Sequence, residues 1–252
     1  SQIHLTSEMI LRTIKRMDQP LNQIHPTSLI SPTAKIGNGN YIGPYCIIGP
    51  NVTIGNFNRL EAYVSIGTPA EHRSAFEGAI DEGVQIGDEC VFREFVTINS
   101  GIERRTTVGH KVIMLRGSHL GHDAIVKDKA SISCNVMIGG HSEVGEGANL
   151  GLGVVVHQWL HIGSYSMVGM GSVVTKNVHP LMLGYGNPFK HAKLNTVGLK
   201  RKGLTEEEIS ALEDYARYAK TAHHVCLQSA SEIGINDTAI KLLREYLASG
   251  AK

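Results

Sequence analysis

The sequence predicts an all-β fold, a parallel β-helix of hexapeptide repeats, followed by a small α-helical domain. Three observations lead to this prediction: an aliphatic residue recurs at every sixth position, glycine contributes 28 of the 252 residues, and only 6% of the chain is aromatic. A period of six matches neither the 3.6-residue period of an amphipathic helix nor the two-residue period of a long strand. It matches short strands joined by tight turns and stacked as coils. A β-sandwich of short strands is the alternative, and it requires no such period.

The repeat runs in three blocks, over residues 24–66, 86–98 and 108–174. The aliphatic residues are expected to point into the core, in about seven or eight triangular coils. Glycine is expected at turns where a Cβ atom would clash or where φ must be positive. Residues 68–85 and 99–107 interrupt the repeat. They are expected to leave the prism as loops, which commonly carry binding residues.

The chain is expected to divide into three parts. Residues 1–20 are predicted to form an N-terminal helical extension, residues 21–186 the β-helix, and residues 187–252 a C-terminal helical domain. In the last part, Thr205 and Glu208 have the spacing of a capping box at the start of a helix. A second helix is predicted over residues 238–247, where apolar residues fall on one face.

Composition excludes several classes of protein. The formal net charge is only +1, whereas a nucleic-acid-binding protein usually has a strong basic excess. No apolar run approaches the roughly 18 residues of a membrane span, and no signal-peptide pattern is present. The four cysteines form no CxxC pair, which disfavours a disulfide framework and a cysteine-based zinc site. The cytoplasm is therefore the expected location.

The repeat also predicts which polar residues lie together. Because three hexapeptides make one coil, residues 18 apart should stack about 4.8 Å apart. Two columns follow: His122, Gly140 and Gln158 form one, and Asp123, His141 and Trp159 form the other. An imidazole is the usual general base, a neighbouring carboxylate can fix its tautomer, and a glycine N–H can face a developing oxyanion. These groups together suit acyl transfer from a thioester.

Two other interpretations of these columns remain open. The histidines could be solvated surface groups, or they could hold a metal ion across a subunit boundary. The metal site is disfavoured because the 119–141 stretch contains no His-x4-His pair, so no metal is expected. Further along, residues 190–202 carry five basic residues and no acidic one. Such a patch suits a phosphate or an acidic carrier protein, although it could be a solvated loop.

Four segments resemble one family. These segments are SHLGHDA at 118–124, GGHSEVG at 139–145, VVVHQW at 154–159 and LNTVGLKRKGL at 194–204. They are similar to the UDP-N-acetylglucosamine acyltransferases of lipid A biosynthesis. The resemblance implies a left-handed β-helix that forms a homotrimer with active sites between subunits. It also implies an acyl carrier protein as partner, whose phosphopantetheine thioester is the donor, a nucleotide-sugar acceptor, and no further cofactor.

The resemblance also assigns roles to residues. His122 would be the general base, Asp123 its orienting group, and the Gly140 N–H the oxyanion donor. The implied substrate-binding residues are Arg73, His119, His141, His157, Gln158, Met170, Asn195, Arg201 and Lys202. Met170 would close the acyl groove and favour shorter acyl chains. Two departures concern the acceptor: residues 70–74 offer no clear match to the family's sugar-contacting carboxylate, and Val197 replaces a glutamate.

The expected function is transfer of an (R)-3-hydroxyacyl group from acyl carrier protein to the 3-position of UDP-N-acetylglucosamine or its 3-amino analogue. Two alternatives remain open. One is an acetyl- or acyl-CoA-dependent enzyme that acts on another nucleotide sugar for surface polysaccharide. The other is a non-catalytic β-helix that binds a sugar as a scaffold.

Overall fold

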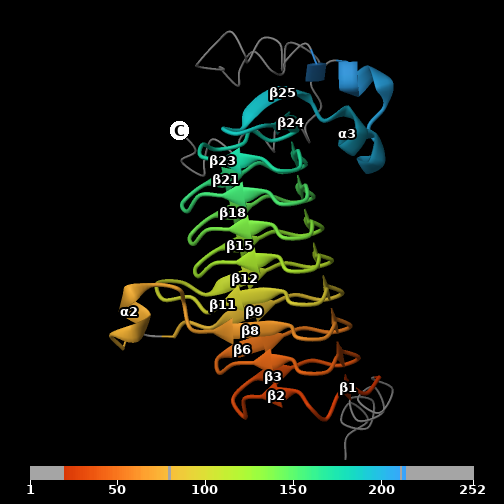
Figure 1. Cartoon of the computed structure of the whole chain (residues 1–252). Helices are drawn as coiled ribbons and strands as arrows, with labels where there is room; N and C mark the ends of the chain where they lie inside the picture. Colours follow the sequence, from red (N-terminus) through yellow and green to blue (C-terminus); the bar gives the residue numbers. More distant parts are fainter. Residues whose placement is uncertain (1–19, 79–80, 211, 214–252) are drawn as a thin grey trace, which may run out of the picture.

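Parallel strands stack in a single column of triangular coils, a left-handed parallel β-helix (Figure 1). This computed structural model describes residues 20–78, 81–210 and 212–213. Each coil contributes one short strand to each of three sheets, which form the three walls of a prism. The fold class predicted from the six-residue period is therefore confirmed.

The first wall, sheet A, has ten strands, in the order β1 (Gln23–Ile24), β4 (Tyr41–Ile42), β7 (Arg59–Leu60), β10 (Val91–Phe92), β13 (Ile113–Met114), β16 (Ser131–Ile132), β19 (Asn149–Leu150), β22 (Met167–Val168), β24 (Met182–Tyr185) and β25 (Lys190–Leu194). The second wall, sheet B, has eight: β2 (Leu29–Ile30), β5 (Ile47–Ile48), β8 (Ser65–Thr68), β11 (Thr97–Asn99), β14 (His119–Leu120), β17 (Met137–Ile138), β20 (Val155–Val156) and β23 (Val173–Val174). The third wall, sheet C, has seven: β3 (Lys35–Ile36), β6 (Val52–Ile54), β9 (Val84–Ile86), β12 (Thr106–Val108), β15 (Ile125–Val126), β18 (Glu143–Val144) and β21 (His161–Ile162).

Strand pairing follows the predicted step of eighteen residues. Leu120 pairs with Ile138, and Ile138 pairs with Val156 in the next coil. Where the chain makes its second excursion, Thr97 pairs with His119, so this coil is four residues longer. The first excursion leaves the prism after β8 and carries the short helix α2 (Arg73–Phe76), which projects from the side of the column (Figure 1).

The aliphatic repeat fills the prism. From Ile42 onward the repeat residues are buried, and those of the central coils, such as Leu120 and Ile138, are fully inaccessible to solvent. Ile24, in the first coil, is 44% exposed. The core is therefore one continuous stack of Ile, Val and Leu side chains, which makes the column a rigid support for its turns.

Glycine was expected in the turns for two reasons, close approach of the chain and positive φ, and the structure shows these at different positions. A Cβ atom on Gly49, which follows a core isoleucine, would lie 2.0 Å from the carbonyl oxygen of Gly67 in the next coil. Close approach of the chain therefore explains this glycine. The left-handed turn position is often occupied by other residues, including Asp123 and His141, both with φ of 60°. Side chains thus project from corners of the prism at a positive-φ position, where glycine was expected.

The wall extends past the boundary expected at residues 186/187. The strand β25 pairs antiparallel with β24, and the helix α3 (Thr196–Lys202) follows it. The predicted capping box is confirmed: Glu208 Oε2 accepts from the Thr205 N–H at 2.8 Å, and Thr205 Oγ1 accepts from the Glu208 N–H at 3.2 Å. The expected helices over residues 1–20 and 238–247 lie outside the described residues, Pro20 excepted. None of the described helices is long and apolar enough to cross a membrane.

Candidate active site

A buried histidine–aspartate pair lies at the corner between sheets B and C. Both residues are in the turn that joins β14 to β15, and Asp123 holds the left-handed position. His122 Nδ1 donates to Asp123 Oδ2 at 2.6 Å. Asp123 is fully buried and His122 is 7% exposed. In the neutral imidazole, a proton on Nδ1 that is shared with Asp123 leaves the other ring nitrogen, Nε2, as the one that can act as a base.

The four-residue excursion holds the Asp123 carboxylate in place. Asp123 Oδ1 accepts three consecutive backbone N–H groups, from Ile102 at 3.1 Å, Glu103 at 2.9 Å and Arg104 at 2.7 Å. Burial alone would raise the pKa of Asp123, but these hydrogen bonds and the one from His122 outweigh it, so the net pKa is lowered. Asp123 therefore stays ionised, and one oxygen remains for His122.

Gly140 lies against the imidazole, as the eighteen-residue step predicts. The His141 N–H donates to the His122 carbonyl at 2.9 Å, which joins the two turns. A Cβ atom on Gly140 would lie 2.8 Å from His122 Nε2, so only glycine leaves room for the ring. The Gly140 N–H meets no acceptor among the described residues. Gly140, whose amide has no acceptor among these residues, therefore lies beside the imidazole, and such an amide is a candidate oxyanion donor.

These groups open into a groove of about 380 Å³ over sheet B. His119, His157 and Gln158, all predicted site residues, line it beside His122 and Gly140. Its floor includes two apolar side chains of sheet B, Met137 and Val155. The groove therefore combines polar groups with an apolar surface, which suits a polar acceptor and an acyl chain.

The histidines in and beside the groove differ in environment. His119 Nδ1 shares a hydrogen bond of 2.8 Å with Thr97 Oγ1, and burial lowers the pKa of His119. Burial also lowers the pKa of His141, whose ring stacks on Trp159 with centroids 3.7 Å apart. His141 meets the ring of His122 edge-on and does not line the groove. Burial therefore favours the neutral form of both histidines, and His122 makes the shortest histidine contact with Asp123, at 2.6 Å.

His122, Asp123 and His141 also form a group of the kind that can hold a metal ion, with one ligand atom from each within 4.8 Å of the others. His141 Nε2 lies 3.7 Å from Asp123 Oδ2. No metal was expected from the sequence. His122 Nδ1 and Asp123 Oδ2 share a hydrogen bond, and Asp123 Oδ1 accepts three N–H groups, so each of these three atoms already has a partner within the chain.

Several predicted site residues lie elsewhere. Arg73 begins α2 and is exposed, and it does not line the groove. Met170 follows β22 at the corner between sheets A and B, where it is 72% exposed. Lys202 ends α3. Met170 and Lys202 therefore lie on other parts of this single chain, whereas Arg73 directly follows His72, whose ring centroid is 5.4 Å from that of His122.

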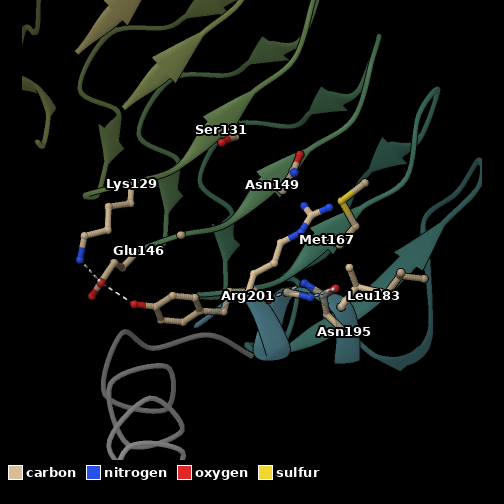
Figure 2. A pocket seen from close by; sticks show the side chains of 12 residues that line it. Lys129, Ser131, Glu146, Asn149, Met167, Leu183, Asn195 and Arg201 are labelled. Carbon is tan, nitrogen blue, oxygen red and sulfur yellow. Dashed lines mark hydrogen bonds and ion pairs between the residues drawn. The ribbon is translucent and has the colours of Figure 1, made fainter. Parts of the chain in front are cut away.

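Asn195 and Arg201 line a second groove, of about 910 Å³, between α3 and sheet A (Figure 2). Arg201 extends from α3 over Asn149 and Met167 of the sheet (Figure 2). Asn195 is mainly a cap: its Oδ1 accepts from the Gly198 N–H at 3.2 Å and its Nδ2 donates to the Tyr165 carbonyl at 2.9 Å. Because sheet A is the wall opposite the corner of sheets B and C, one chain does not bring these residues to His122.

Two residues of the groove were not predicted. Glu71 and Asn99 both line it beside His119 and His122. Glu71 belongs to the first excursion, where the sequence showed no clear match to a sugar-contacting carboxylate. Its charge opposes the lowering of the His119 pKa, which reports that the two side chains are close. The sequence did indicate that the first excursion leaves the repeat close to the column of histidines, and such a loop can fold over the site and contribute residues such as Glu71 to it.

Comparisons with known proteins identify the family that the chain resembles. Residues 33–68 match the family model "Bacterial transferase hexapeptide (six repeats)", and residues 177–248 match "Udp N-acetylglucosamine O-acyltransferase; Domain 2". The acyl-[acyl-carrier-protein]--UDP-N-acetylglucosamine O-acyltransferase of Thiobacillus denitrificans is 39% identical over 133 residues, 52% of each chain. The protein of the same name from Gloeothece citriformis is 32% identical over 176 residues, 68% of this chain and 63% of that one. The chain thus spans about half the length of the first relative.

Solved structures are similar along most of the chain. The LpxA structure from Acinetobacter baumannii is 27% identical with a TM-score of 0.74, and it covers 89% of this chain and 93% of its own. The UDP-N-acetylglucosamine acyltransferase of Francisella novicida is 26% identical with a TM-score of 0.77, over 88% of this chain and 90% of its own. Sequence and structure together show that the chain belongs to the UDP-N-acetylglucosamine acyltransferase family of hexapeptide-repeat proteins.

Proposed function

We propose that this protein transfers an (R)-3-hydroxyacyl group from acyl carrier protein to the 3-position of UDP-N-acetylglucosamine or its 3-amino analogue. The observation that carries the proposal is the position of Gly140 beside the His122 ring, whose Nδ1 is hydrogen-bonded to Asp123. A Cβ atom on Gly140 would lie 2.8 Å from His122 Nε2, and the Gly140 N–H meets no acceptor in the part of the chain that the structure describes. The named activity of the relatives supports the choice of donor and acceptor.

The chemistry follows from this contact. His122 Nε2 takes the proton from the acceptor hydroxyl or amine as its oxygen or nitrogen attacks the thioester carbonyl carbon. The carbonyl oxygen becomes an oxyanion, to which the Gly140 N–H donates. When the intermediate collapses, the C–S bond breaks and the leaving sulfur takes the proton from the His122 imidazolium. The products are an ester or amide and the free thiol of the carrier.

The apolar floor of the groove supports an acyl donor. Met137 and Val155 are each 44% exposed on sheet B, next to the histidines. An alkyl chain lying on them would remove both from water, which is favourable by about 25 cal/mol per Å² of apolar surface. The basic side chain of Arg201, in the second groove, suits a phosphate or an acidic carrier. No metal or further cofactor takes part in this proposal.

A homotrimer is part of the proposal because the two grooves lie on different walls of one chain. A neighbouring copy could bring its Arg201 to the His122 of this one. Two weakened variants, H122A and R201A, test this when co-expressed. Mixed trimers would contain some sites with both residues intact, so partial recovery of acyl transfer is expected. Activity no higher than that of either variant alone would place the whole site within one copy.

The activity itself is tested with H122A and a matched control. His110 also pairs with an aspartate, Asp88, at 3.4 Å, but on another corner and in an exposed position. H122A should lose transfer from 3-hydroxyacyl carrier protein to UDP-N-acetylglucosamine or its 3-amino analogue, and H110A should retain it. Undiminished transfer by H122A would refute the base.

The same assay separates the alternatives. Transfer only from acetyl- or acyl-CoA to another nucleotide sugar would support the surface-polysaccharide enzyme. Binding of a sugar without any transfer, across both donor classes, would support a scaffold. We place the reaction in the cytoplasm, for which the scattered cysteines provide the support: buried Cys46 and Cys90 are both free thiols.

A further inference from the structure

One arginine makes three contacts behind the histidine–aspartate pair. Arg104 Nε donates to the Asp123 carbonyl at 2.6 Å, and its Nη2 donates to the His141 carbonyl at 3.1 Å. Its Nη1 lies 3.2 Å from Glu143 Oε1 in an ion pair. The planar guanidinium thus donates to two carbonyl groups in two successive coils.

The two carbonyls belong to equivalent turn positions. Asp123 and His141 occupy the left-handed position of the same corner in adjacent coils, each with φ of 60°. A cation that joins their carbonyls fixes the spacing of the two turns. One of these turns carries the His122–Asp123 pair, and the other follows Gly140 directly.

The main chain of the same arginine reaches the carboxylate. Of the three N–H groups on Asp123 Oδ1, that of Arg104 is the shortest, at 2.7 Å. Arg104 therefore contacts Asp123 twice, at its side chain through an amide and at its carbonyl through the guanidinium. Without the guanidinium, the excursion turn would keep its three N–H bonds to Asp123 Oδ1 but lose its side-chain bonds to the two carbonyls, so the orientation of the carboxylate would be less tightly fixed.

We propose that Arg104 is a positioning residue, which acts through Asp123 to hold His122 in the tautomer and orientation that proton transfer needs. The role rests on the proposed function only in that His122 is the base of that reaction. The ion pair with Glu143 adds little to folding stability, since the Arg104 and Glu143 side chains are 40% and 22% exposed.

The test compares R104A and R104K with a matched control at the next position. Arg105 Nε donates to the Glu82 carbonyl at 3.1 Å, away from Asp123, so R105A removes an arginine without touching the pair. R104A should lower kcat about 10- to 100-fold, as expected for misplacement by a fraction of an ångström, with KM nearly unchanged. R104K keeps the charge but not the fork, and its kcat should lie between those of R104A and the wild type. Added guanidinium ion should restore part of the R104A rate.

A second readout is independent of turnover. In protein with 15N-labelled histidine, His122 should show a protonated Nδ1 and a bare Nε2 in the wild type and R105A, and a tautomer mixture in R104A. An unchanged His122 tautomer in R104A, or a kcat within about two-fold of wild type, would overturn the proposal. If the wild type transfers no acyl group but R104A still changes the tautomer, the proposed function fails and the positioning role stands.

Discussion

The contact between Gly140 and His122 makes G140A the most informative single change. A Cβ atom there would lie 2.8 Å from His122 Nε2, 2.9 Å from Cε1 and 3.2 Å from Cδ2, and these are its three nearest atoms. An ordinary contact is at least 3.4 Å, so the ring must move by about 0.6 Å at Nε2. The imidazole is tied to Asp123 at 2.6 Å, so this movement strains or breaks that bond.

The expected loss in kcat is about 10- to 100-fold, since a displacement of about 1 Å in a catalytic group costs about 100-fold. The overpacking should also destabilise the fold by about 1 kcal/mol. In a chain of this size that is about 2–4 °C in Tm. Steady-state acyl transfer and thermal melts measure both effects on the same sample.

A double variant tests the cause. In an H122A background the ring is gone, so adding G140A should leave Tm unchanged to within about 1 °C. If G140A lowers Tm equally with and without the His122 ring, the added methyl group collides with something else and the reasoning is refuted. If G140A keeps the wild-type kcat, the imidazole does not act from the observed position.

Three further predictions concern Asp123, His119 and Met170. D123N keeps an oxygen for the three backbone N–H groups but presents an N–H donor to His122 Nδ1, which favours the wrong tautomer. We expect kcat to fall about a thousand- to ten-thousand-fold with Tm almost unchanged. A loss below ten-fold would contradict the orienting role of Asp123. The pKa of His119 is lowered in the folded protein, so its contribution to stability is present above the unfolded pKa of about 6.5 and is lost as pH falls toward the folded value. Tm should therefore decline less from pH 7 to 5 in H119Q than in the wild type. Equal declines in the two proteins would contradict this prediction. M170G should shift competition between 10-carbon and 14-carbon donors toward the longer chain, and a wild-type preference for 14 carbons would refute the proposed limit on length.

The repeat explains why much of this site could be predicted from the sequence. A six-residue period fixes which side chains enter the core, and three periods fix the vertical neighbour of each turn residue. The placement of His122 beside Gly140, and of His141 beneath Trp159, followed from counting alone. The fold class followed from the same count.

The remaining features depend on segments that leave the repeat. No period constrains the excursions, so neither Glu71 in the groove nor the three N–H groups on Asp123 could be placed in advance. Arg73 was assigned to the site from a motif, but it lies at the exposed start of α2. Asn195 was expected to hold substrate, and its side chain is engaged in capping α3.

A structure of the protein with a bound nucleotide sugar would test the whole account most directly. The account predicts that the 3-hydroxyl or 3-amino group lies about 3 Å from His122 Nε2, the reach of a general base. The alkyl end of a bound acyl group should run over Met137 and Val155 of sheet B. A reactive group more than about 5 Å from Nε2, with the sugar held elsewhere on the prism, would contradict it.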